Sequence, residues 1–290
     1  MTTQTMLHST AQPTPQPAPP LPFEYIPLCL DNAVPGTTIG DIRFALRPAS
    51  HEKTVAALIG SVERKPVAED PYPDLLPSER WAWARVMCTE FGRLNEVALA
   101  RSRWEIYAPA MAGEPLYARS TIVESVRKGA LAFCNGITET RNAEGTLLIR
   151  CHDGIILTHD CEKPFFFEPE PVKAEIPDAL AYRNIHTVYH RYPWKPTDWD
   201  NNIHVDEYAQ SCGFKSGLPE FITYMDWIYH AVSESGWRDG RPYSIQLNRV
   251  LPIYLGEKIE VVAWPAGSGL QVRFLSDGFE RVTATVDRLG

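Results

Sequence analysis

The stretch "SRWEIYAPAMAGEPLYARSTI", residues 102–122, has a second version in "YSIQLNRVLPIYLGEKIEVVAW", residues 243–264. Both contain a proline, then a Gly-Glu pair that begins four residues later. The matched prolines are Pro109 and Pro252, so the offset between the two copies is 143 residues. Alternating apolar residues before the proline and after the Gly-Glu pair predict two strands joined by a short connection. The chain therefore contains an internal duplication.

A long helix is expected ahead of each duplicated stretch. Residues 77–99 open on Pro77 and Ser78, and residues 218–235 carry Pro219 at a position typical of a first helical turn. In the second segment, apolar residues recur at spacings of three and four, the pattern of a buried helix face. Further alternating segments follow each copy. A long helix and an antiparallel meander, each present twice, predict an α+β fold.

Composition divides the chain into four parts. Residues 1–22 are proline-rich and nearly uncharged, which predicts a disordered or polyproline-like tail. Residues 23–160 hold the first copy and residues 179–290 the second. Between them, residues 161–178 contain closely spaced acids and prolines, which indicates a linker.

The bulk composition excludes several classes of protein. The 290 residues carry a formal charge of -8 and contain no dense basic run, which argues against a nucleic-acid or anionic-membrane surface. No apolar run approaches the roughly 18 residues that a membrane helix needs, and the N-terminus lacks a signal-peptide pattern. Six cysteines without a CxxC motif are typical of reduced thiols. A cytoplasmic protein is the expectation.

The stretch "TDWDNNIHVDEYAQSCGF", residues 197–214, holds the candidate chemistry. Together with the duplication, it resembles the MaoC-like family of (R)-specific enoyl-thioester hydratases and dehydratases in its double-hotdog form. The resemblance covers the chain from about residue 35 onward. It implies two long helices, each wrapped by a curved antiparallel sheet, and an acyl thioester of coenzyme A or of a carrier protein as substrate. It implies no metal and no redox cofactor, and it leaves a homo-oligomer open.

The motif of that family matches this chain at Asp200, Asn202, His204, Asp206, Ala209, Gly213 and Phe214. The resemblance implies that Asp200 and His204 are catalytic and that Asn202 supports their geometry, with Asp198 as the alternative aspartate. The first copy has no histidine at the equivalent place. This implies that the second half performs the chemistry and that the first half shapes the acyl pocket.

The chemistry of hydration explains why these residue types would be needed. A histidine near its neutral pKa can both accept and donate a proton, and a spacing of four residues places Asp200 and His204 on one side of a helix or turn. Asp206 and Glu207 are expected at the start of a helix, pointing away from the site. The segment Gly217, Leu218, Pro219 and Phe221 is expected to present backbone N–H groups to the enolate oxygen and to contact the substrate.

Glu220 is a departure from the family pattern, because many relatives have glycine there. Either Glu220 takes part as an acid or base, or the substrate is an unusual acyl chain that undergoes dehydration, isomerisation or cyclisation. One alternative function is therefore a hotdog thioester hydrolase that uses Glu220. A second is a non-catalytic acyl-binding protein, in which Asp200 and Asn202 are ordinary caps and His204 is structural. A metal site at His186 and His190 is disfavoured, because no acid or cysteine of suitable spacing accompanies them.

Overall fold

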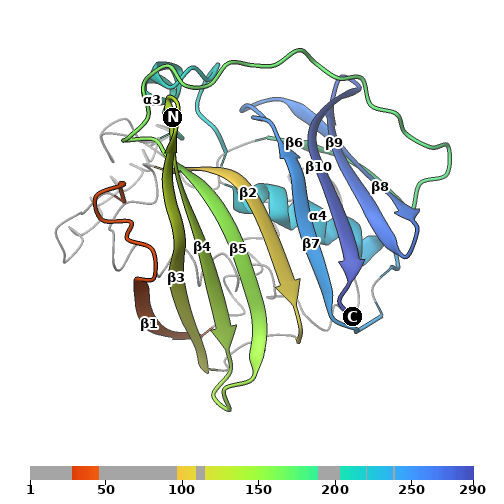
Figure 1. The fold of residues 1–290 in the computed structure, drawn as a ribbon. Helices are drawn as coiled ribbons and strands as arrows, with labels where there is room; N and C mark the ends of the chain where they lie inside the picture. Colours follow the sequence, from red (N-terminus) through yellow and green to blue (C-terminus); the bar gives the residue numbers. More distant parts are fainter. Residues whose placement is uncertain (1–27, 46–96, 109–114, 189–202, 220, 238) are drawn as a thin grey trace, which may run out of the picture.

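The computed structural model describes residues 28–45, 97–108, 115–188, 203–219, 221–237 and 239–290. Within these ranges, ten strands form one continuous antiparallel sheet, and two helices accompany it (Figure 1). The helices are α3 (Asp206–Ser211) and α4 (Ile222–Glu234). The strands are β1 (Thr38–Ala45), β2 (Val97–Ile106), β3 (Pro115–Lys128), β4 (Leu131–Arg141), β5 (Leu147–Leu157), β6 (Tyr182–Thr187), β7 (Tyr243–Val250), β8 (Lys258–Ala266), β9 (Gly269–Ser276) and β10 (Phe279–Arg288).

The sheet repeats its own topology about its centre. The strand order is β1-β3-β4-β5-β2-β7-β10-β9-β8-β6, and β2 pairs with β7 at the seam. Outward from the seam, the order is β2-β5-β4-β3-β1 on one side and β7-β10-β9-β8-β6 on the other. At the seam Arg103 pairs with Gln246, and 246 minus 103 is 143, the offset of the duplicated motif. Equivalent residues of the two copies thus meet on the axis of the duplication, which confirms the internal repeat.

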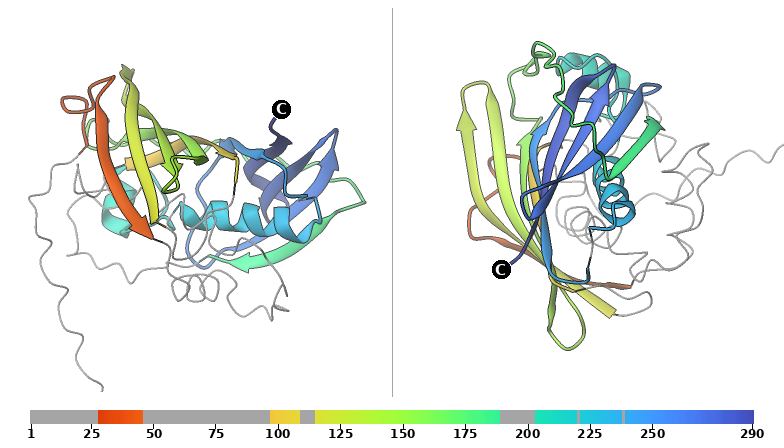
Figure 2. Two further views of the ribbon diagram at one scale, coloured as in Figure 1. Left: turned by 90° about the horizontal axis from the view of Figure 1, so that it is seen from below. Right: turned by 90° about the vertical axis from the view of Figure 1, so that its right-hand side faces the viewer.

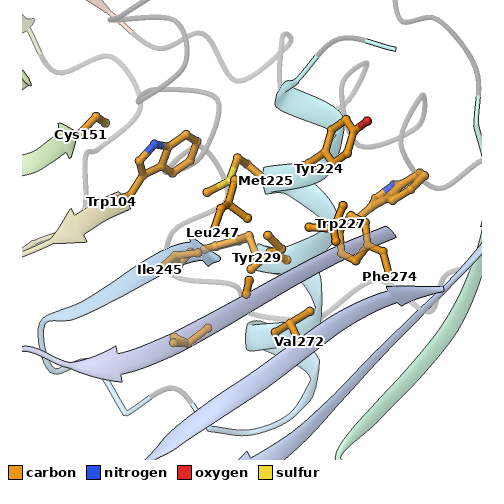
Figure 3. Close-up of a cluster of buried hydrophobic side chains, with 14 of the residues drawn as sticks. Trp104, Cys151, Tyr224, Met225, Trp227, Tyr229, Ile245, Leu247, Val272 and Phe274 are labelled. Carbon is orange, nitrogen blue, oxygen red and sulfur yellow. The ribbon is translucent and has the colours of Figure 1, made fainter. Parts of the chain in front are cut away.

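Helix α4 runs along one side of the sheet, as both views in Figure 2 show. Its Met225, Ile228 and Val232 are fully buried and belong to the main hydrophobic core. Figure 3 shows α4 between Val272 and Phe274 of β9 and Trp104 of β2. Replacing a fully buried Met or Ile of α4 by alanine would cost about 2–5 kcal/mol of stability. The helix ends before Gly236, whose φ of 67° lies in the left-handed region that favours glycine.

Two expected helix boundaries are wrong. The helix expected at residues 218–235 begins only at Ile222, and Pro219 lies three residues before it. The helix expected at residues 77–99 falls mostly outside the described residues, but Val97–Leu99 belong to β2, where Val97 pairs with Leu157. Cross-strand hydrogen bonding satisfies the backbone there, and it overrides an apolar pattern that also suits a helix.

The segment at residues 161–178, which was predicted to be a linker, contains no helix and no named strand. It crosses the molecule toward β6 (Figure 1), and Lys173 forms an isolated bridge with Phe279 on the way. The proline-rich tail, residues 1–22, lies outside the described residues. Among the helices that are described, none has the length and apolar character needed to cross a membrane.

Candidate functional site

The candidate site is built on the chain that leads from α3 to α4. Val205 precedes α3 in an extended conformation, and the helix ends at Cys212. Gly213 has a φ of 100°, and a side chain there would collide with the backbone carbonyl of Phe166. The N–H groups of Phe165 and Phe166 donate to the Cys212 carbonyl at 3.1 and 3.0 Å. The motif glycine is thus required both by its φ and by the close passage of the connecting segment.

His204 is held by the chain that precedes α4. Its Nδ1 lies 2.6 Å from the carbonyl oxygen of Leu218, and the Leu218 N–H donates to the Ile203 carbonyl at 2.9 Å. A carbonyl oxygen only accepts hydrogen bonds, so Nδ1 of His204 carries the proton. In the neutral imidazole, Nε2 is then the acceptor nitrogen, as a general base requires. His204 is half-buried and lies two residues before α3, not on it.

Asp206 fixes the same chain from the other side. Its Oδ1 accepts a hydrogen bond from the Gly217 N–H at 2.8 Å. Asp206 is exposed in the first turn of α3, as expected, and its carboxylate satisfies the Gly217 N–H of the neighbouring loop. A Cβ at Gly217 would lie 2.8 Å from the carbonyl carbon of His204 and closer still to its oxygen. Only glycine allows the two backbone segments to approach this closely.

α4 begins later than expected, but its first turn still offers backbone N–H groups that can bind an anion. Phe221 is the N-cap residue of α4 and makes no side-chain capping bond, and no acid occupies the first turn. An α-helix leaves its first N–H groups without intrahelical partners and carries partial positive charge at that end. Gly217, Leu218 and Pro219 precede this end and are buried. His204 is thus hydrogen-bonded to Leu218, four residues before α4 begins.

Residues 203–218, called the site segment below, pack against the N-terminal half of the sheet. A small hydrophobic cluster joins Ala98 of β2 to residues of the site segment and the β7–β8 connection, namely Ile203, Ala209, Cys212, Phe214, Leu218 and Tyr254. The hydroxyl of Tyr208 in α3 lies 2.9 Å from Oγ1 of Thr158, directly after β5. Sequence reasoning missed this contact, because no local pattern relates positions 50 residues apart.

Several candidate residues lie outside the described residues. These are Asp200, Asn202 and Glu220, together with Asp198 and His190. Their roles therefore stay predictions.

The other histidines and the cysteines of the described residues that are buried or partly buried pack against neighbouring side chains. His186 stacks on Trp227 with ring centroids 4.6 Å apart, and the hydroxyl of Tyr182 lies 2.7 Å from Nδ1 of His230. Burial raises the pKa of the Cys134 thiol to about 11, and it also raises the pKa of Cys212. Thiols with raised pKa values are poor nucleophiles. Among the described residues, no group of histidine, cysteine and acid side chains is arranged to hold a metal ion.

Solved structures with the same arrangement of strands and helices exist. HtdX from Mycobacterium tuberculosis superposes with a TM-score of 0.60 at 14% identity, over 87% of this chain and 99% of that one. A MaoC-like dehydratase from Phytophthora capsici gives a TM-score of 0.59 at 13% identity, over 90% of this chain and 98% of that one. The chain has the double-hotdog fold.

A third structure shows the same fold within a longer protein. The full-length peroxisomal multifunctional enzyme type 2 from Drosophila melanogaster superposes with a TM-score of 0.59 at 15% identity, over 87% of this chain. This chain spans 48% of that enzyme, about half its length. In sequence, neither models of known protein families nor curated proteins match the double-hotdog chain. The double-hotdog fold that the resemblance implied is thus confirmed by three-dimensional likeness alone.

Proposed function

We propose that this double-hotdog protein is a hydro-lyase that adds water to an enoyl thioester or removes it from a 3-hydroxyacyl thioester. The observation that carries the proposal is the hydrogen bond from His204 Nδ1 to the carbonyl of Leu218, which lies four residues before α4 begins. It selects the tautomer in which Nε2 accepts a proton, and it links the imidazole to the chain that leads into the helix end that favours negative charge. The resemblance to MaoC-like dehydratases in fold supports the same class of reaction.

The hydration step uses the imidazole of His204 and the N–H groups at the start of α4. His204 Nε2 takes a proton from water, and the water oxygen forms a bond to carbon 3 of the enoyl thioester. The electron pair of the carbon–carbon double bond moves onto the thioester oxygen as an enolate, which N–H groups at the start of α4 stabilise. The protonated histidine, or a water that it orients, then returns a proton to carbon 2. Dehydration is the reverse sequence.

Other residues take supporting roles in this proposal. Asp200 orients the water and balances the charge of the imidazolium, and Asn202 supports that geometry. The substrate is a thioester of coenzyme A or of a carrier protein. The N-terminal half, which contacts α3 through Thr158 directly after β5, encloses the acyl group.

A direct assay tests the proposal. Purified wild type and His204→Ala are incubated with crotonyl-CoA and with longer and branched enoyl-CoAs, and mass spectrometry records the gain of one water. Hydration by wild type and a loss of at least about 100-fold in His204→Ala are expected. His152→Ala is the matched control, because His152 is half-exposed on β5 and pairs with Glu105 at 3.7 Å. Release of free coenzyme A by wild type and His204→Ala alike would instead support a hydrolase, and Glu220→Ala would then be the variant that loses activity.

A further inference from the structure

An exposed aromatic ring and two exposed lysines lie beside the site segment. Phe167 belongs to the connecting segment, residues 161–178, and is 75% exposed, the highest value among the large apolar side chains of the described residues. Lys163 of the same segment and Lys215 of the site segment are exposed as well. A single exposed ring is common on protein surfaces, and its position between two cations is what distinguishes Phe167.

Backbone and ring contacts hold the connecting segment against the end of α3. The N–H groups of Phe165 and Phe166 both donate to the Cys212 carbonyl. The Phe166 ring stacks on Phe214 with ring centroids 4.6 Å apart. Figure 1 shows the segment passing α3 before it crosses toward β6. The next residue, Phe167, is therefore held beside the site segment, although its own side chain is exposed.

Each of the two lysines is positioned by a tyrosine ring. Lys163 Nζ lies 4.1 Å from the ring centroid of Tyr208 in α3, and Lys215 Nζ lies 5.6 Å from that of Tyr254. Within the described ranges, neither ammonium group pairs with a carboxylate. The ring face attracts the cation, and a side chain that is already held in place loses less freedom when it binds an anion.

The carboxylates near this ring and these lysines help to decide which kind of ligand fits. Glu168 directly follows Phe167 and pairs with Arg281, which neutralises it. Glu162 and Glu207 are exposed on the connecting segment and on α3. An acidic protein surface laid over this region would meet those two carboxylates, whereas a small ligand can place its phosphates on the lysines alone. A small phosphorylated ligand with an aromatic ring therefore fits better than an acidic protein.

The lysines lie within reach of His204. Gly217 follows Lys215 by two residues, so their Cα atoms are at most about 7 Å apart. A Cβ at Gly217 would lie 2.8 Å from the carbonyl carbon of His204. On the other side, Tyr208 follows His204 by four residues, a span of at most about 14 Å. The extended pantetheine arm of coenzyme A is of comparable length, so it can join a thioester at His204 to a nucleotide at the lysines.

We propose that Lys163, Phe167 and Lys215 bind the nucleotide end of coenzyme A, so that the substrate is a coenzyme A thioester and not a carrier-protein thioester. This inference rests on the proposed hydro-lyase function and narrows its substrate class. The adenine ring stacks on Phe167, because an exposed aromatic ring offers a flat face to any base. The 3′-phosphate and the diphosphate bind the two ammonium groups, since lysine recognises phosphate as a compact point charge.

The first test measures binding of adenosine 3′,5′-bisphosphate, the nucleotide end of coenzyme A without its pantetheine arm, by isothermal titration calorimetry. Phe167→Ala is expected to raise the Kd of the wild type by at least about fivefold. Lys163→Gln and Lys215→Gln should each raise Kd severalfold and weaken its dependence on salt. Lys173→Gln and Phe279→Ala are the matched controls and should keep the wild-type Kd, because both residues are exposed where the connecting segment bridges to β10.

The second test connects this binding to the reaction. It compares kcat/KM for an enoyl-CoA that wild type hydrates with kcat/KM for the corresponding enoyl-pantetheine, which lacks the nucleotide. Wild type should prefer the coenzyme A thioester by at least about fivefold. The ratio should fall toward one in Lys163→Gln, Phe167→Ala and Lys215→Gln, mainly through a higher KM for the enoyl-CoA. All three side chains are exposed, so thermal melts of the variants should match that of wild type.

The outcomes separate this inference from the proposed function. If wild type binds the nucleotide and none of the three variants weakens binding, the nucleotide lies elsewhere and the inference is wrong. It is equally wrong if wild type does not bind the nucleotide at millimolar concentration, or if it hydrates enoyl groups only on an acidic carrier protein; in that last case the hydro-lyase function stands. If the nucleotide binds, the three variants weaken it and no enoyl thioester is hydrated, the nucleotide site stands and the hydro-lyase function falls.

Discussion

The contact between Gly217 and His204 gives the sharpest test of how the site is held. A methyl group at Gly217 would lie 2.8 Å from the carbonyl carbon of His204, closer still to its oxygen, and 3.3 Å from Asp206 Oδ1. Carbon atoms in proteins essentially never approach other backbone atoms to less than 3.0 Å. Gly217→Ala therefore forces the two backbone segments apart by roughly half an ångström.

That displacement acts on three hydrogen bonds at once. They are His204 Nδ1 to the Leu218 carbonyl at 2.6 Å, Leu218 N–H to the Ile203 carbonyl at 2.9 Å, and Gly217 N–H to Asp206 Oδ1 at 2.8 Å. Overpacking of this kind costs about 1–3 kcal/mol of stability. A misplacement of about 1 Å in a catalytic group costs on the order of 100-fold in rate, so a loss of roughly tenfold or more in kcat is expected.

The assay is enoyl-CoA hydration by Gly217→Ala, with a thermal melt of the same sample. Gly236→Ala serves as the matched control, because Gly236 follows the far end of α4 and no atom of the described residues lies within 4 Å of a Cβ there. Its φ of 67° makes alanine unfavourable by about 1 kcal/mol, so it destabilises the protein without moving His204. Wild-type kcat in Gly217→Ala, or an equal loss in Gly236→Ala, would refute the argument that this close approach positions the imidazole.

Variants at two further positions probe interactions of single carboxylates. Asp206→Ala removes the acceptor of the Gly217 N–H, so it should lower stability by about 1 kcal/mol and kcat/KM by up to about tenfold. Asp206→Asn keeps an oxygen at that position and should retain most activity. Equal kinetics for wild type and both variants would contradict this prediction. Burial raises the pKa of Glu139, but hydrogen bonds from Arg141 and Arg150 outweigh it and hold that pKa below its ordinary value. A depressed folded-state pKa contributes stability above the unfolded-state pKa that is lost as the pH falls through the folded-state value. The Tm difference between wild type and Glu139→Gln should therefore be largest near neutral pH and shrink below about pH 4, and a difference that is constant with pH would show that the ion pairs are not its source.

The sequence alone was sufficient to predict the duplication and the fold. The repeated Pro-x-x-x-Gly-Glu motif and the alternating strands are local patterns with a fixed period, and such patterns survive in any fold that contains them. His204 and Gly213 were singled out by the resemblance to the MaoC-like motif, and the catalytic role of His204 stays a prediction. The pairing of Arg103 with Gln246 shows that even the axis of the repeat was implicit in the offset of 143 residues.

Tertiary structure decided what local patterns do not encode. The carbonyl that selects the tautomer of His204 belongs to Leu218, 14 residues later, and the N–H that draws in Asp206 belongs to Gly217. The start of α4 moved from residue 218 to Ile222, because a proline before a helix is compatible with more than one boundary. The hydrogen-bonded pairs Ser102–Asp153 and Ser120–Thr138 form only when β2 meets β5 and β3 meets β4, since side chains on separate strands become neighbours through the sheet and not through the sequence.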